Sequence, residues 1–267
     1  MPIHAAGLYD TEERGTKIFD FVVSSYTPTV SALLQTLHTP ISTRRKILAV
    51  AQSQQTKQAF SALPSTREEI RRITQKATQS SVDLVAIEDE KGTVERVLNE
   101  MTRCEWVHLA CHGIQDLDNP TKSAFVLADG NLELAELIKH SLPHAEFAFL
   151  SACQTATGDV KLAEEAVHLA AGMMLAGYRS VIATMWSILD KDGPKVAEAV
   201  YAELLKDGKA DHTRAAYALH RAVEKLRLSG APLLAWMPFI HMGHSYSSLP
   251  ATLPEVEVKD PSGPVLS

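Results

Sequence analysis

Short apolar runs alternate with helical patterns along most of the chain, and this alternation constrains the fold more than any other feature. Seven runs have the length and composition of buried strands: residues 19–26, 46–52, 82–87, 106–111, 147–152, 179–186 and 234–243. Helical spacing of apolar residues occurs between or after them, at residues 92–101, 131–140, 164–178, 193–205 and 212–226. This order predicts an α/β domain, with a mainly parallel central sheet and helices on both faces.

Composition narrows the possible partners and location. The chain has 267 residues, of which 45% are hydrophobic, and its net charge is −6, so no overall basic field favours nucleic acid. No apolar stretch approaches the roughly 20 residues of a membrane span, and the first residues do not resemble a signal peptide. Cysteine is scarce and odd in number. We therefore expect a cytoplasmic protein with reduced thiols and neither a nucleic-acid nor a membrane partner.

A basic and acidic cluster, "TREEIRRI" at residues 66–73, is interpreted as a solvated helix face in which Glu68 and Glu69 balance the arginines.

One predicted strand ends in a histidine. In "EWVHLACHGIQD", strand alternation puts His108 on one face and Leu109 on the other, and His112 follows at the tip. Gly113 comes next, where a glycine permits a sharp turn and brings a backbone N–H close to a bound group. Ligands and chemistry collect at the carboxyl ends of strands in a parallel α/β sheet, so His112 is a candidate site residue.

A second predicted strand ends in a cysteine. In "EFAFLSACQTATGD", Cys153 lies beyond an apolar run and is surrounded by small residues that leave room for a substrate. A thiol attacks only as the thiolate, and an imidazole can accept its proton. Cys153 and His112 at two strand ends could form such a pair, with the backbone N–H groups of Gly113 and Cys153 facing a developing oxyanion. The alternative for Cys153 is an inert core thiol, and for His112 a hydrogen-bonded structural histidine.

Other kinds of site find little support in the sequence. Cys104, Cys111 and His112 lack the close spacing of zinc ligands, so we expect no metal, and the two cysteines are interpreted as structural. Neither the dinucleotide glycine pattern nor a phosphate-binding loop occurs, and Ser151 lacks the G-x-S-x-G elbow of a serine nucleophile.

Four motifs in order resemble one known family, the CHAT domains, which are caspase-like and related to separases. They are "VHLACHG", "AFLSACQTATGD", "EEAVHLAAGMMLAGYRSVIATMWSILDKD" and "WMPFIHMG", between about residues 82 and 243, and "LYDTEERGTKIFDFVVSSYTPTVSALL" upstream is also similar. The sequence of the third motif most resembles that of fungal members. The resemblance implies a caspase-like three-layer sandwich, with His112 as catalytic histidine, Cys153 as nucleophile and Gly113 on the oxyanion side. It implies peptide-bond hydrolysis through a thioester, with no metal or organic cofactor.

The resemblance also suggests a substrate pocket. "MWSILDKD" resembles a separase stretch in which an acid follows a tryptophan by four residues, here Asp190 after Trp186. A carboxylate there would favour Arg or Lys at P1. Ser151 occupies the position, two residues before the nucleophile, where metacaspases carry an acid. The alternative for Asp190 is to cap the helix that begins near residue 193.

Three parts are expected along the chain. Residues 1–81 resemble the N-terminal part of a CHAT region, which is expected to lack the first strands of a full member. Residues 82–245 form the catalytic core, and residues 246–267 form a flexible, proline-rich tail. No repeat segment accompanies the core, so a repeat-containing regulatory protein is the expected partner besides a protein or peptide substrate.

The sequence leaves three functions open. The first is a regulatory cysteine endopeptidase that a partner activates. The second is a non-catalytic CHAT-fold interaction module in a defence or cell-death pathway. The third is a generic α/β ligand-binding domain, which would not pair His112 with Cys153.

Overall fold

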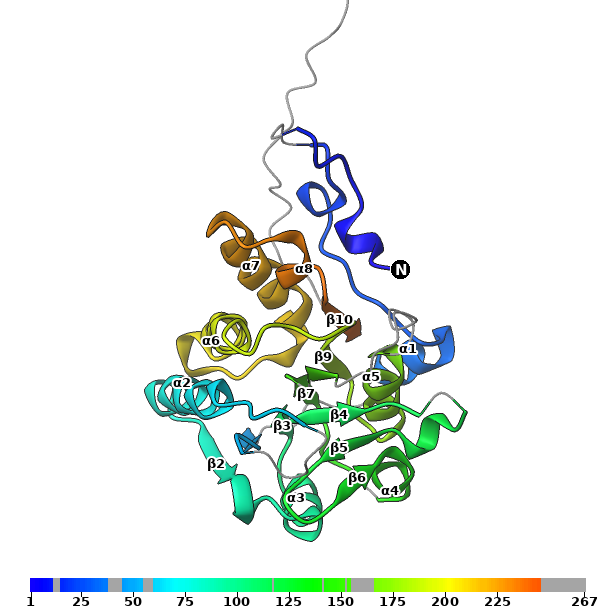
Figure 1. Ribbon diagram of the computed structural model, residues 1–267, viewed down its shortest axis with the longest axis vertical. Coiled ribbons are helices and arrows are strands. Elements are labelled where there is room, and N and C mark those ends of the chain that lie inside the picture. Colours follow the sequence, from blue (N-terminus) through cyan, green and yellow to red (C-terminus); the bar gives the residue numbers. More distant parts are fainter. Residues whose placement is uncertain are drawn as a thin grey trace, which may run out of the picture.

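The computed structural model describes residues 1–11, 15–37, 45–54, 60–116, 118–140, 142–151, 153–154 and 166–245 (Figure 1). Its strands are β1 Lys46–Ala51, β2 Asp83–Glu88, β3 Trp106–Ala110, β4 His112–Ile114, β5 Ala124–Val126, β6 Asn131–Glu133, β7 Phe147–Leu150, β8 Cys153–Gln154, β9 Ser180–Thr184 and β10 Phe239–Gly243. Its α-helices are α1 Val30–Leu37, α2 Ser65–Gln79, α3 Val94–Met101, α4 Leu134–Lys139, α5 Ala166–Leu175, α6 Gly193–Leu204, α7 Ala215–Leu228 and α8 Leu233–Trp236.

The central sheet has six strands in the order β10-β9-β7-β3-β1-β2. Five of them are parallel, and β10 runs antiparallel to β9 at one edge. The strands β1, β3, β7 and β9 are buried almost throughout, which explains why they appear in the sequence as continuous apolar runs. The prediction of an α/β fold with a mainly parallel sheet is confirmed.

Two apolar clusters cover the two faces of this sheet. Helices α2, α6 and α7 pack on the face that includes Trp106 and Phe149. Helices α3, α4 and α5 pack on the opposite face, which includes Val107 and Leu109. Figure 1 shows the two groups of helices on opposite sides of the central strands. The alternation predicted for β3 is therefore confirmed, and the molecule has three layers.

A second, smaller sheet continues from the carboxyl ends of the central strands. Its order is β6-β5-β4-β8, and each of its strands is only two or three residues long. The chain leaves β3 at Ala110 and enters β4 at His112, and it leaves β7 at Leu150 and enters β8 at Cys153. The sequence predicted two strand tips at these places and did not predict a second sheet.

The strand predicted at residues 19–26 is wrong. Ile18–Asp20 form a 3-10 helix, because the carboxylate of Asp20 accepts hydrogen bonds from the backbone N–H groups of Gly15 and Lys17. Only Tyr26 reaches the sheet, through a single bridge to Met242 on the edge strand β10. The tail predicted for residues 246–267 lies outside the described residues.

Candidate active site

His112 and Cys153 are register partners. Strands β4 and β8 pair in parallel, with His112 opposite Cys153 and Gly113 opposite Gln154. On its other side β4 pairs with β5, which places Gly113 between two strands. The structure thus brings the backbones of the three predicted catalytic residues together, just beyond the carboxyl ends of β3 and β7.

The imidazole of His112 is held by the segment between β1 and α2. Its Nε2 lies 2.7 Å from the carbonyl oxygen of Ser61, and the ring of Phe60 stacks on it with centroids 5.0 Å apart. His112 is 4% exposed. Its Nδ1 is buried and has no hydrogen-bond partner among the described residues. A carbonyl oxygen only accepts, so this contact places a proton on Nε2 and leaves Nδ1 as the basic nitrogen of the neutral ring.

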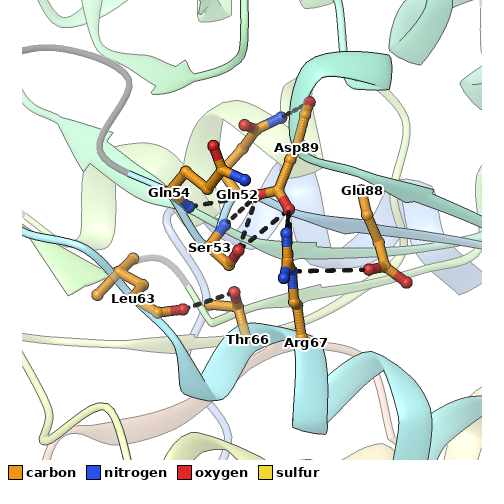
Figure 2. A network of polar contacts seen from close by, with 8 residues as sticks. All are labelled: Gln52, Ser53, Gln54, Leu63, Thr66, Arg67, Glu88 and Asp89. Carbon is orange, nitrogen blue, oxygen red and sulfur yellow. Dashed lines mark hydrogen bonds and ion pairs between the residues drawn. The ribbon is translucent and has the colours of Figure 1, made fainter.

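A polar network anchors that segment where it leaves β1 (Figure 2). The carboxylate of Asp89, just after β2, accepts hydrogen bonds from the backbone N–H and the hydroxyl of Ser53 at 2.7 and 2.9 Å, and from the N–H of Gln54 at 3.2 Å. Its other oxygen is bound by the guanidinium of Arg67 from α2. The two ends of the segment also meet directly, since the N–H of Leu63 donates to the carbonyl of Ser53 at 3.0 Å.

Asp89 is suited to this role by its charge and its backbone. It is buried, and its φ of 48° is a left-handed conformation that Asp tolerates better than most residues. Burial alone would raise the pKa of Asp89, but hydrogen bonds from Arg67, Ser53 and Gln54 together lower it below its ordinary value. The carboxylate is therefore ionised at neutral pH and ties β1, β2 and α2 together beneath the segment that holds His112.

A second polar group lies between α2 and the central sheet. Glu69 of α2 is 2% exposed, and its Oε1 lies 2.9 Å from Nε2 of His108 on β3. The hydroxyl of Ser151 donates to the other carboxylate oxygen at 3.1 Å. A Cβ atom at Gly193 would come within 2.9 Å of that oxygen, so the glycine that begins α6 leaves space for the carboxylate.

One interpretation from the sequence changes here, and one predicted site residue gains a partner. The interpretation of residues 66–73 as a solvated helix face holds for Glu68, which pairs with Arg71 and Arg72, but it is wrong for Glu69. Glu69 faces inward because it lies three positions after Thr66 and four before Ile73, on the buried stripe of α2. Ser151, predicted as a substrate-binding residue, is buried and its hydroxyl is bound by Glu69.

The predicted pocket residues follow the carboxyl end of β9. Trp186 is half-buried and packs against the apolar cluster on the α5 face. Asp190 is half-buried, and its Oδ2 accepts a hydrogen bond from the backbone N–H of Ser65 at 2.9 Å. Asp190 therefore binds the first turn of α2, and the residue before α6 is Asp192.

The other two cysteines have the environment of structural residues. Cys104 and Cys111 are both buried, and burial raises the pKa of Cys104 to about 11. In the described part of the chain, no group of three His, Cys, Asp or Glu side chains is arranged to hold a metal ion. No helix within the described ranges is long and apolar enough to cross a membrane.

Sequence reasoning missed Phe60, Ser61 and Asp89. Ser61 acts through its backbone carbonyl, which leaves no trace in the residue type. Phe60 is an isolated aromatic in a polar, Gln-rich stretch, and that isolation was the available signal. Asp89 lies two residues after the strand predicted at residues 82–87, at the carboxyl end where site residues were sought.

Comparison with known proteins places the chain in a family. A family model described as the CHAT domain matches residues 1–244. Among solved structures, the Arg-specific cysteine proteinase gingipain R is 14% identical, with a TM-score of 0.48 over 74% of this chain and 46% of that chain. A protein from Geobacter sulfurreducens is 13% identical, with a TM-score of 0.31 over 42% of this chain and 52% of that one. This chain thus spans about half the length of either.

No curated protein gave a match. The family model, in contrast, extends over nearly the whole chain and includes both β4 and β8. This chain belongs to the CHAT domain family.

Proposed function

We propose that this chain is a cysteine endopeptidase in which Cys153 is the nucleophile and His112 is the general acid and base. The register pairing of His112 with Cys153 carries the proposal. Neighbouring strands lie about 4.8 Å apart, and register partners share one face of a sheet. A thiol and an imidazole at these two positions are within reach of a proton transfer.

The contacts of His112 support a defined role for each ring nitrogen. Nε2 donates to Ser61, and the stacked ring of Phe60 restrains the imidazole from the side. Nδ1, which has no partner among the described residues, then takes the proton of the Cys153 thiol. The thiolate and imidazolium form the reactive pair.

The reaction follows from this pair in two steps. The Cys153 sulfur forms a bond to the carbonyl carbon of the peptide, and the backbone N–H groups of Gly113 and Cys153 bind the oxyanion. The C–N bond breaks as Nδ1–H of His112 protonates the leaving nitrogen, which leaves a thioester. Water then gives a proton to Nδ1 and adds to the carbonyl carbon, and the C–S bond breaks to restore the thiolate.

We assign substrate preference to Asp190 and Trp186. Asp190 Oδ2 holds Ser65, while Oδ1 has no hydrogen-bond partner in the described part of the chain. One oxygen thus remains for an Arg or Lys side chain at P1, with the half-buried ring of Trp186 as an apolar wall.

A second function, a non-catalytic CHAT-fold interaction module, is favoured by the burial of His112. An imidazole that is 4% exposed under Phe60 does not reach a leaving group from outside without a rearrangement. In the peptidase proposal, the chain alone undergoes that rearrangement often enough to be labelled, and a repeat-containing regulatory partner favours it and so activates the enzyme.

Covalent labelling tests the proposal and separates the two functions. Acyloxymethyl-ketone peptides with Arg, Lys, Asp or Met at P1 are incubated with the wild type, Cys153→Ala, His112→Ala and the matched control Cys104→Ala. Labelling of the wild type and Cys104→Ala, with none in Cys153→Ala, is expected. Labelling that survives Cys153→Ala contradicts the nucleophile, and an unlabelled wild type supports the non-catalytic module.

Asp190→Asn tests the P1 preference with the same probes. Labelling by the Arg and Lys probes should fall relative to the Met probe, with Asp192→Asn as the matched control. Equal labelling of wild type by the Asp and Arg probes contradicts the role of Asp190.

A further inference from the structure

A cavity lies away from His112 and Cys153, at the β10 edge of the sheet. Its enclosed space is about 40 Å³, and the hollow reaches about 470 Å³ when the open mouth is included. One wall is the N-terminal segment, through residues such as Phe19 and Val22. The lining also includes residues of α7, Trp236 of α8 and Phe239 of β10. In Figure 1 the N-terminal segment is the blue trace beyond α8 and β10.

Helix α7 presents one continuous face to the cavity. The lining residues of this face are Ala216, Leu219, His220, Val223 and Arg227, which have the spacing of a single helical stripe. The first four positions are apolar or half-buried, and the stripe ends in a cation at Arg227. The cavity is therefore an apolar space with one charged end.

The polar lining residues His4, Tyr26 and His241 already have hydrogen-bond partners within the protein. His4 contacts the hydroxyl of Tyr26 through Nδ1 at 2.8 Å and the carbonyl of Met237 through Nε2 at 2.9 Å. His241 contacts the hydroxyls of Ser25 and Ser180 at 2.7 and 2.8 Å. These contacts tie the N-terminal segment to β9 and β10 and leave little polar capacity for a ligand.

Arg227 differs from these groups. Its guanidinium carbon lies 3.4 Å from the centroid of the Phe19 ring and 5.5 Å from that of Trp236, so aromatic faces hold it in place. Its Nε is buried and has no hydrogen-bond partner among the described residues. The aromatic rings stack on the face of the guanidinium. Its N–H groups lie in the plane of the guanidinium, where they can donate two hydrogen bonds to one carboxylate.

The acidic side chains near Arg227 have other partners. Burial lowers the pKa of Arg227, and the charges of Glu224 and Asp20 oppose this shift. Glu224 lies 3.6 Å from Arg221, and Asp20 accepts hydrogen bonds from Gly15 and Lys17. A partly buried guanidinium without a bound carboxylate loses hydration, and an anionic ligand would compensate for that loss.

We infer that this cavity binds a small amphipathic carboxylate, with its aliphatic body between α7 and the N-terminal segment and its carboxylate on Arg227. The apolar lining accepts the body, and the aromatic-held guanidinium fixes the charged end. The site is independent of the proposed peptidase chemistry, because its lining includes none of the residues assigned to catalysis.

Calorimetric titration of the whole chain tests the inference, with decanoate below its micellar concentration as the probe. Decanol and butyrate are the matched probes, since the first lacks the charge and the second lacks the long body. Decanoate should bind roughly 10- to 100-fold more tightly than decanol, the equivalent of one charge-assisted pair. Equal binding of decanoate and decanol, or no binding of decanoate at millimolar concentration, would overturn the inference. This comparison needs only the wild type.

Variants of Arg227 test whether its guanidinium binds the carboxylate of decanoate. Arg227→Met retains the apolar stem and should weaken decanoate binding by roughly 10- to 100-fold while leaving decanol binding unchanged. Arg227→Lys keeps the charge without the planar fork and should have intermediate affinity. Arg221→Met, on the exposed side of the same helix, is the matched control and should bind as the wild type does. Wild-type affinity in Arg227→Met would refute the assignment whatever the peptidase activity proves to be.

Discussion

The backbones of His112 and Cys153 are register partners on two neighbouring parallel strands, although the residues lie far apart in the sequence. The relationship follows from the central sheet, in which β3 and β7 are adjacent and parallel. Each chain segment continues past its strand end into β4 or β8 after a short break. The register of β3 with β7 therefore continues into β4 and β8 and pairs the two site residues.

Alkylation should distinguish Cys153 from the two other cysteines. Burial raises the pKa of Cys104 to about 11, so its thiolate is rare at pH 8, and Cys111 is also buried. Cys153, as the proposed partner of His112, should react with iodoacetamide first in the folded protein. Peptide mass mapping over a time course measures this order. In concentrated guanidinium all three should react alike, whereas equal rates in the folded protein would contradict the activated thiol.

Phe60→Leu tests the restraint on the imidazole. Loss of a stacked ring worth about 0.5–1.5 kcal/mol should lower kcat roughly two- to tenfold, because His112 would sample more orientations. KM should change little, since Phe60 acts through His112. The exposed Phe21 supplies the control variant Phe21→Leu. An increase in kcat would show instead that the Phe60 ring blocks access to His112.

Asp89→Asn should destabilise the fold by about 1–3 kcal/mol, because the carboxylate accepts several hydrogen bonds, including those of Arg67. The pKa of Asp89 is lowered by folding, so its contribution is complete above the unfolded value near 4 and is lost as pH falls below that value. The difference between variant and wild type in urea unfolding should therefore shrink below about pH 4. Glu88→Gln, at an exposed neighbour of Arg67, should have little effect.

The central sheet could be predicted because its strands are buried on both faces, which makes β1, β3, β7 and β9 continuous apolar runs. Helices α3, α6 and α7 could be predicted from their apolar stripes. The second sheet could not, since strands of two or three residues have no measurable period.

The candidate site, too, could be predicted from the sequence only in part. The proximity of the backbones of His112, Gly113 and Cys153 could be predicted because chemistry collects at strand ends and because the motifs resemble a family. The contacts around them are tertiary. The backbone carbonyl of Ser61 binds His112, and Glu69 points inward to His108 from a highly charged helix. Residue type alone does not encode either contact.

His241 should make stability depend on pH. Burial, and then the charges of His212 and His244, lower its pKa to about 3. Below the unfolded value near 6.5 the unfolded chain binds a proton that the folded chain does not, so stability is complete above that value and falls toward pH 3. The slope from this residue is about 1.4 kcal/mol per pH unit.

The variant His241→Gln lacks this titration and should show a flatter curve between pH 6.5 and 3 in urea unfolding. His140→Gln, at an exposed histidine, is the control and should keep the wild-type slope. A His241→Gln curve parallel to that of the wild type would contradict the assignment.

Ser151→Ala decides whether Ser151 positions the nucleophile or binds substrate. The Ser151 hydroxyl is bound by the buried carboxylate of Glu69, two residues before Cys153. Its removal leaves a buried carboxylate oxygen without that donor, which should cost about 1–3 kcal/mol of stability. It should lower kcat more than it raises KM, because the chain loses a restraint two residues before Cys153. The control Ser229→Ala, at the exposed end of α7, should change neither quantity. Raised KM with unchanged stability would assign Ser151 to the substrate instead.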